Sequence, residues 1–351
     1  MARSWAAGLS AAMVLGLTGC FGTAANRYAP DELRRELASR KVPEADRVVL
    51  HELPPEILER ARALVLHLES SDLKVHALVR AMFDRDQLGL RYDELATITG
   101  AEALHERCGN CVALAGIFVG LARAVGLEAR YIDVSNRVHE TRYGEAGSTV
   151  RFGHVTAMVD TGLERISLDF ARFGPVKWYR VLDDLEAQAH FYNNRGYDYL
   201  DPPGEGAPAP DWREAERQFR LATQVKPSFA RAWNNLGIAV ARQGRTAEAV
   251  GHYRRAAELD PRMAAPHANL GAAFLQRGDV AAALEELAEA ARIDPGGAHI
   301  HYNLAVARLR AGDRAGAVTA LQRTLKLSAT YPGAVELLER LTPGSPGAGG
   351  G

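Results

Sequence analysis

A cysteine-containing turn followed by a long apolar run is the part of the sequence best suited to chemistry. It reads HERCGNCVALAGIFVGLARAV, from His105 to Val125. Gly109 and Asn110 predict a turn, and asparagine is a favoured N-cap, so we expect a buried helix that begins at Cys111 and stops at Gly126. The dipole and free amides of a first helical turn favour a thiolate. Cys111 is therefore a candidate nucleophile.

A thiolate nucleophile needs an imidazole and a group that orients it. Downstream, GHVTAMVD and RISLDF have the composition and alternation of two consecutive strands. With a turn centred between Thr161 and Gly162, His154 lies opposite Asp169 on one face of the hairpin. These residues predict a triad of Cys111, His154 and Asp169.

Three stretches, GNCVALAGIFVGLARAVGLEARYIDV, GHVTAMVD and LDF, together resemble the transglutaminase-like superfamily of papain-type cysteine enzymes. The resemblance runs from about Glu56 to Tyr179 and implies an α+β papain-like domain. It places the family's nucleophile on Cys111, its histidine on His154 and its aspartate on Asp169. It also implies thioester acyl transfer on amide bonds without a cofactor, with hydrolysis favoured over crosslinking. Many members have an aromatic residue after the histidine, whereas this chain has Val155.

Several alternatives stay open for these residues. Cys108 and Cys111 form a Cys-x-x-Cys pair, as in thioredoxin-like oxidoreductases, although the apolar strand that precedes that motif is missing. With His105 they are also candidate zinc ligands, but no fourth ligand is apparent. A Cys108–Cys111 disulfide would consume the nucleophile, and a Cys108 that points into the core would be inert. His139 is a rival base without a matched aspartate.

The oxyanion of an acyl-transfer reaction needs hydrogen-bond donors. The backbone amide of Cys111 is the first candidate, because it lies at a helix N-terminus. Gln87 and Tyr92, upstream in the chain, are candidates for a second donor.

The carboxy-terminal half repeats at a fixed step of 34 residues. The recurring positions are Asn235, Asn269 and Asn303, then Gly244, Gly278 and Gly312, then Pro227, Pro261 and Pro295. Helix, glycine turn, helix and proline break at this period resemble tetratricopeptide repeats and imply an all-α solenoid. YNNRGYDYL and WREAERQFRLATQVKP form a degenerate first repeat with a loop insert, so about four repeats are expected.

Such repeats present a concave groove to peptides, which the first helix of each repeat would line. The expected lining residues are Arg231, Asn234, Arg242, Gln276, Tyr302 and Arg310. The arginines favour a partner segment rich in carboxylates. The repeats alone would also support a different function, a non-catalytic protein-interaction scaffold with a degenerate transglutaminase-like domain.

The first twenty residues predict export and lipid attachment. An apolar run from Trp5 to Leu17 is too short to span a bilayer. The following LTGC resembles a bacterial lipobox, which implies that Cys20 is lipidated and anchors the protein in the cell envelope. Phe21 at the next position favours the outer membrane, facing the periplasm. An ordinary secretory signal is the alternative.

Charge gives no sign of a nucleic-acid partner, because lysine plus arginine number 42 and aspartate plus glutamate 43.

Within the first domain, helices are expected from Pro55 and over Leu73–Phe83, since apolar residues recur there at helical spacing. The expected domain order is a signal peptide at 1–19, a tether with a short helix at 20–47, a transglutaminase-like domain at 48–188, repeats at 189–342 and a disordered tail at 343–351.

Overall fold

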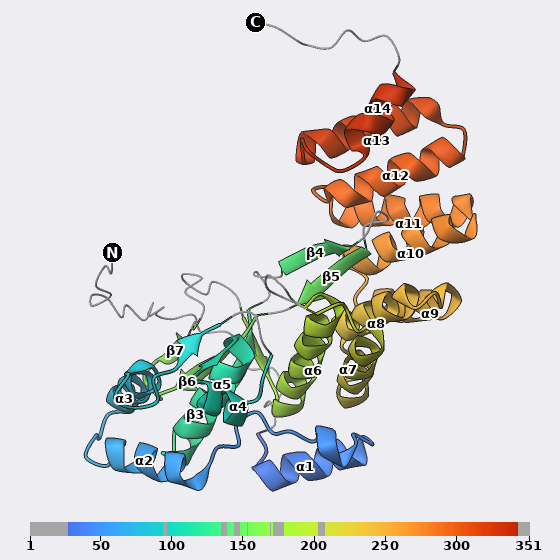
Figure 1. Ribbon diagram of the computed structural model, residues 1–351. Coiled ribbons are helices and arrows are strands. Elements are labelled where there is room, and N and C mark those ends of the chain that lie inside the picture. Colours follow the sequence, from blue (N-terminus) through green and yellow to red (C-terminus); the bar gives the residue numbers. More distant parts are fainter. Residues whose placement is uncertain are drawn as a thin grey trace, which may run out of the picture. The chain divides into compact units, whose positions relative to one another are not determined.

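The computed structural model describes residues 27–93, 97–134, 139–143, 148–152, 154–168, 170, 179–202 and 208–342, with 139–143 and 148–152 described by their backbone alone. The chain divides into two units (Figure 1). Unit 1 contains Met1–Val138 and Phe152–Pro227, and unit 2 contains His139–Arg151 and Ser228–Gly351. None of the helices in the described ranges is long and apolar enough to cross a membrane.

Unit 1 is a mixed α/β domain whose helices surround a small sheet. Its helices are α1 (Pro30–Ser39), the short 3-10 turn η1 (Glu44–Asp46), α2 (Pro55–Val65), α3 (Ser71–Phe83), α4 (Gly100–Glu106), α5 (Cys111–Ala124), α6 (Asp184–Leu200) and α7 (Trp212–Val225). The predicted helix starting at Pro55 is confirmed, with proline at its first position. The prediction over Leu73–Phe83 is also confirmed, although α3 begins two residues earlier.

The main sheet of unit 1 has four strands in the order β7-β6-β3-β8. Its strands are β3 (Glu128–Asp133), β6 (Val155–Asp160), β7 (Arg165–Leu168) and β8 (Arg180–Leu182), all antiparallel to their neighbours. Two short strands, β1 (Arg91–Tyr92) and β2 (Cys108–Gly109), pair in parallel just before α5. The predicted strands GHVTAMVD and RISLDF therefore exist as the neighbours β6 and β7.

The turn between β6 and β7 differs from the predicted one. Asp160 pairs with Arg165, so the loop has four residues rather than two. The reason is local hydrogen bonding: Gly162 donates its N–H to Asp160, and the Thr161 hydroxyl bonds both the N–H and the C=O of Glu164. Gly162 has φ +83°, a conformation that glycine adopts without strain. The register is therefore shifted by two residues from the expected one.

α5 forms the centre of unit 1 and is buried around most of its circumference, as its apolar sequence predicts. It packs on β3 and β6 and is contacted by α2, α3 and α4. Gly116 and Gly120 lie against the backbone of residues 50–53. A Cβ on Gly116 would lie 2.4 Å from the Leu50 carbonyl oxygen, and one on Gly120 would lie 2.5 Å from that of His51. Two glycines one turn apart thus let the turn at residues 50–51 pack directly on the helix.

The expected tether at 20–47 is not a tether over its described part. Leu33, Leu37 and Val42 are almost fully buried, so α1 and the turn after it belong to the core of unit 1. The polar composition of this segment misled the prediction, because a few leucines at helical spacing are enough to dock a short amphipathic helix.

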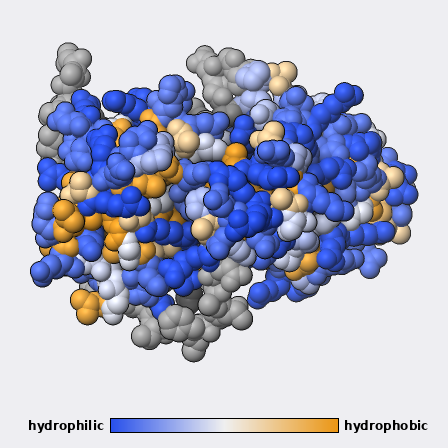
Figure 2. Space-filling view, turned by 90° about the horizontal axis from the view of Figure 1, so that it is seen from below, coloured by the Kyte–Doolittle hydropathy of each residue, from blue (hydrophilic) through white to orange (hydrophobic). Residues whose placement is uncertain are grey.

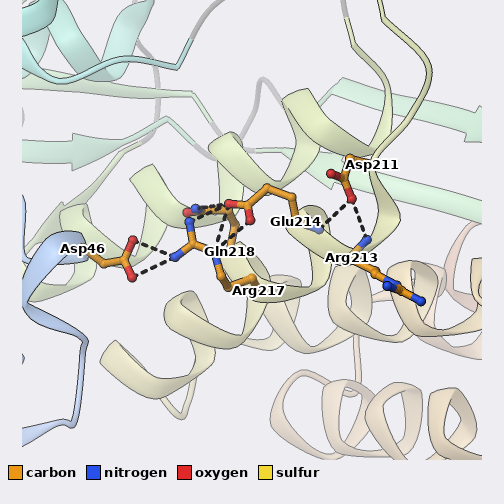
Figure 3. Close-up of polar contacts among 6 residues, drawn as sticks. All are labelled: Asp46, Asp211, Arg213, Glu214, Arg217 and Gln218. Carbon is orange, nitrogen blue, oxygen red and sulfur yellow. Dashed lines mark hydrogen bonds and ion pairs between the residues drawn. The ribbon is translucent and has the colours of Figure 1, made fainter.

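Polar contacts fix the same segment to α6 and α7. The Tyr28 N–H donates to Asp184, and Arg40 donates to the Val225 carbonyl. Figure 3 shows Arg217 of α7 between two carboxylates, Asp46 from η1 and Glu214 from its own helix. These carboxylates raise the pKa of the Arg217 guanidinium, with the Glu214 hydrogen bond as the largest cause.

Unit 1 also has an apolar area on its surface. Leu66 and Leu73, at the end of α2 and the start of α3, are 81% and 55% exposed. Figure 2 shows hydrophobic residues gathered at the left of the view, the side on which α2 and α3 lie in Figure 1. The two leucines thus contribute to an exposed apolar surface.

Unit 2 is the predicted all-α solenoid. Its helices are α8 (Ala230–Arg242), α9 (Thr246–Leu259), α10 (Ala264–Arg277), α11 (Val280–Ile293), α12 (Ala298–Arg310), α13 (Arg314–Leu327) and α14 (Ala334–Leu341). β4 (His139–Tyr143) and β5 (Ser148–Phe152) form a separate two-stranded sheet. The predicted turn glycines Gly244, Gly278 and Gly312 all have φ near +81°.

The helix pairs pack in the way the repeat pattern predicts. Gly237 lies against the Tyr253 ring, and Gly271 against Leu287, at distances where a Cβ would clash. Gly196 of α6 lies against Phe219 of α7 in the same manner. The degenerate first repeat is therefore a true helix pair, and it belongs to unit 1 rather than to the unit that holds the other repeats.

Candidate functional site

Cys111 is the first residue of α5, as the sequence predicts. Asn110 is the N-cap, and its side-chain oxygen accepts hydrogen bonds from the N–H groups of Val112 at 3.1 Å and Ala113 at 3.2 Å. The cap therefore uses the second and third amides of the helix. The Cys111 N–H has no hydrogen-bond partner within the described part of the chain. It is left available at the positive end of the helix, beside a thiol in a residue that is 7% exposed.

His154 directly precedes β6 and is 5% exposed. Its carbonyl accepts from the N–H of Val134, just beyond the end of β3. Because a tight turn at Gly126 reverses the chain, β3 runs antiparallel to α5, and the end of β3 returns to the start of the helix. β6 is antiparallel to β3, so it begins at this same end. The topology places His154 and Cys111 at one end of the α5–sheet layer.

Asp169, the third predicted member of the triad, lies outside the described residues. The two residues around it are described: Leu168 ends β7 and pairs with Ala157. The observed register differs from the predicted one by two residues, and an even shift leaves each residue on the same face of the hairpin. The His154–Asp169 pair therefore stays a prediction.

A second pair of ionisable groups lies at the same end of β3. Asp133 is the last residue of β3 and pairs with Val155, the neighbour of His154. The His190 Nε2 of α6 lies 3.9 Å from an Asp133 carboxylate oxygen, and both side chains are almost fully buried. Arg180 lies 4.0 Å from the same carboxylate. No sequence pattern indicates this pair, because its members come from separate elements.

Two further residues that the sequence did not single out support the helix start. The Asn110 amide nitrogen donates to the Thr97 hydroxyl at 3.0 Å, and Asp198 of α6 accepts from the Thr97 N–H at 2.8 Å. Thr97 and Asn110 are 5% and 6% exposed. Burial raises the pKa of Asp198 to about 6, against the opposing effect of the Thr97 hydrogen bonds and Arg195.

Of the two candidates for a second oxyanion donor, the structure brings Tyr92 beside the cysteine motif. Tyr92 pairs with Gly109, two residues before Cys111, in the β1–β2 ladder. Gln87 lies in the turn between α3 and β1, where its N–H donates to Asp84. The β1–β2 pairing therefore favours Tyr92.

The two cysteines of the Cys-x-x-Cys pair lie in different elements. Cys108 and Cys111 are both free thiols, one in β2 and the other in α5. In the described residues no three histidine, cysteine or carboxylate side chains cluster as metal ligands, and His105 does not join the two cysteines in such a group. The rival base His139 belongs to unit 2, whereas Cys111 belongs to unit 1.

The predicted groove residues are not equally free to meet a partner. Asn234 is fully buried and accepts from Asn269 at 2.9 Å, which links neighbouring repeats. The Tyr302 ring stacks on Tyr331 at 5.0 Å, and Arg310 donates to the Leu275 carbonyl. Gln276 is exposed and accepts from Thr246. Arg231 and Arg242 are half-buried, and the Arg231 guanidinium lies over Phe229.

Comparison with protein families matches the two parts of the chain to different families. Residues 62–170 match the transglutaminase-like superfamily, and residues 210–264 and 274–341 match two tetratricopeptide repeat families. The chain contains a transglutaminase-like domain followed by tetratricopeptide repeats. The transglutaminase-like match covers β1 to β7 and includes Cys111, His154 and Asp169.

Among solved structures, the similarities are to repeat proteins. Pseudomonas aeruginosa pilF is 22% identical, with 44% of this chain and 67% of that chain covered and a TM-score of 0.40. MamA from Desulfovibrio magneticus is 21% identical, with 44% and 82% covered and a TM-score of 0.38. YrrB, a repeat protein with an unusual peptide-binding site, is 19% identical, with 44% and 79% covered and a TM-score of 0.36. These similarities are too low to carry an argument. No curated protein matches the chain.

Proposed function

We propose that the transglutaminase-like domain is a cysteine enzyme that acts on amide bonds by thioester acyl transfer, with hydrolysis favoured over crosslinking. The observation that carries the proposal is the position of Cys111. It begins a buried helix, its N–H is left over by the cap, and His154 lies at the same end of the sheet. A nucleophile, an amide donor and an imidazole at one end are the parts that acyl transfer needs.

In the proposed reaction the Cys111 sulfur bonds to the carbonyl carbon of an amide. The Cys111 N–H stabilises the oxyanion, and the imidazolium of His154 gives its proton to the leaving amine as the C–N bond breaks. Water then adds to the thioester, His154 takes one of its protons, and the C–S bond breaks to give a carboxylic acid and the free enzyme. An amine in place of water would give a new amide instead.

Labelling with an electrophile tests the nucleophile. We expect iodoacetamide to modify Cys111 at pH 6.5 at least about tenfold faster than Cys108, because a thiolate rather than a thiol reacts. Peptide mapping would locate the modification on the reduced, folded protein. Cys111→Ala should abolish the fast reaction and Cys108→Ser should preserve it. A folded protein without fast labelling would instead favour the alternative, a non-catalytic scaffold.

We also propose that the repeats bind a peptide segment rich in carboxylates, along the first helices of unit 2. Arg242, Gln276 and Arg310 occupy equivalent positions 34 residues apart, at the ends of α8, α10 and α12. Two of the three carry positive charge, and Gln276 and Arg310 are exposed. An acidic peptide meeting this row would pair with the guanidinium groups.

A fluorescent poly-glutamate peptide provides a direct test of this groove. We expect binding that weakens at least about tenfold when Arg242 and Arg310 are both changed to glutamate, since like charges then face the peptide. The charge-matched control changes Arg255 and Arg292 to glutamate, because both are exposed arginines on second helices, α9 and α11. Equal weakening by the control variant would reduce the effect to net charge and contradict a specific groove.

Lipid attachment at Cys20 and an outer-membrane location remain proposals from the sequence, because residues 1–26 lie outside the described part of the chain.

A further inference from the structure

We propose that Asp198 is a positioning residue for Cys111, acting through Thr97 and Asn110, so that α6 holds the start of the nucleophile's helix in place. The inference rests on the proposed role of Cys111. Asp198 lies near the end of α6, and Cys111 is 87 residues earlier in the chain. The structure joins them by hydrogen bonds within unit 1.

The direction of each hydrogen bond follows from chemistry. An ionised carboxylate only accepts, so Asp198 takes hydrogen bonds from the N–H and the hydroxyl of Thr97. The hydroxyl proton is then committed, and the Thr97 oxygen must accept from Asn110. This fixes the Asn110 amide with its nitrogen toward Thr97 and its oxygen toward the N–H groups of Val112 and Ala113.

The orientation of the Asn110 side chain determines which backbone N–H group remains free for catalysis. With its oxygen on the second and third amides, Asn110 leaves the first amide, that of Cys111, free to act on an oxyanion. A flipped Asn110 would present its NH2 group to the helix start, where donors already point, and the cap would be lost. Asp198 therefore controls which groups meet a substrate without touching one itself.

Burial makes this arrangement sensitive to pH. Ionised Asp198 is costly because it is desolvated, which raises its pKa to about 6. Two sets of groups oppose this effect and lower the pKa of Asp198. They are the Thr97 amide and hydroxyl, in the loop before α4, and the charge of Arg195 on its own helix. No ionisable group described in α5, α7 or β3 contributes to the shift. Below pH 6 the Asp198 carboxyl is protonated and can donate a hydrogen bond to Thr97. The directions of the hydrogen bonds from Asp198 through Thr97 to Asn110 are then no longer fixed.

Amide hydrogen exchange at Val112 and Ala113 tests the proposal without relying on enzymatic activity. In the parent protein, exchange corrected for its intrinsic pH dependence should accelerate about fivefold as pH falls from 7.5 to 5. This factor corresponds to losing the stabilisation of about 1 kcal/mol that one N-cap provides. Asp198→Asn should show the fast rate at both pH values, because an amide nitrogen donates to Thr97. Thr97→Val should do the same, and Thr97→Ser should restore the parent behaviour.

The control is Asp211→Asn, because Asp211 caps α7 in the same unit and asparagine is an equally good cap. It should leave the exchange at Val112 and Ala113 unchanged. An unchanged pH response in Asp198→Asn, or full protection in Thr97→Val, would overturn the positioning role. Failure of Cys111 to label with iodoacetamide would contradict the proposed enzyme while leaving this exchange result intact, so the two ideas fail separately.

Discussion

A His154→Gln variant is expected to react with iodoacetamide at Cys111 about 100-fold more slowly than the parent protein at pH 6.5. A thiolate–imidazolium pair keeps a cysteine ionised at this pH, whereas a cysteine with an ordinary pKa near 8.5 is about 1% thiolate. At pH 9.5 an unassisted thiol is also ionised, and the two proteins should react at similar rates. A loss confined to low pH is therefore the expected result, measured as the rate of modification against pH.

The two other histidines of interest make this experiment specific. His139→Gln should leave the profile unchanged, because the proposed base is His154 and the sequence matches no aspartate to His139. His190→Gln addresses the buried pair with Asp133 at the same end of the sheet. If His190→Gln removed the low-pH reactivity and His154→Gln did not, the base would be His190 and the sequence assignment would be wrong.

Patterns that repeat along the chain made the helices predictable. The 34-residue step placed the turn glycines Gly244, Gly278 and Gly312. The same step relates the contact of Gly237 with Tyr253 to that of Gly271 with Leu287. Asn110 as a cap and Cys111 as the first helical residue followed from propensity over a few residues. In both cases the deciding interactions lie within one element or between adjacent ones.

Contacts between distant segments were not predictable in this way. Thr97 and Asp198 meet across a separation of 101 residues. The repeat stretch YNNRGYDYL contains Asp198, but nothing in it points to Thr97. The register of the β6–β7 hairpin depended on side-chain bonds of Asp160 and Thr161 that compete with a two-residue turn. The segment expected to be a tether docks through Leu33 and Leu37, whose partners lie elsewhere in unit 1.

A Gly116→Ala variant is expected to lose about 2–4 kcal/mol of unfolding free energy in unit 1. The added methyl group would lie 2.4 Å from the Leu50 carbonyl oxygen and 3.0 Å from its carbon. Both are backbone atoms, so no side chain can rotate away. Either α5 or the turn at residues 50–51 must move, although alanine alone favours a helix by about 1 kcal/mol.

Gly251→Ala is the matched control, because Gly251 is also inside a helix, α9, but nothing lies within 4 Å of the position a Cβ would occupy. That variant should be stabilised by about 0.5–1 kcal/mol, in unit 2. Hydrogen exchange along α5 and α9, read in each variant, separates the two units. Since α5 carries Cys111 at its first residue, a shift of the helix should also slow iodoacetamide labelling of Gly116→Ala under conditions where it remains folded. Unchanged protection of α5 in Gly116→Ala would mean that the segment at 50–53 does not pack on the helix as closely as the structure has it.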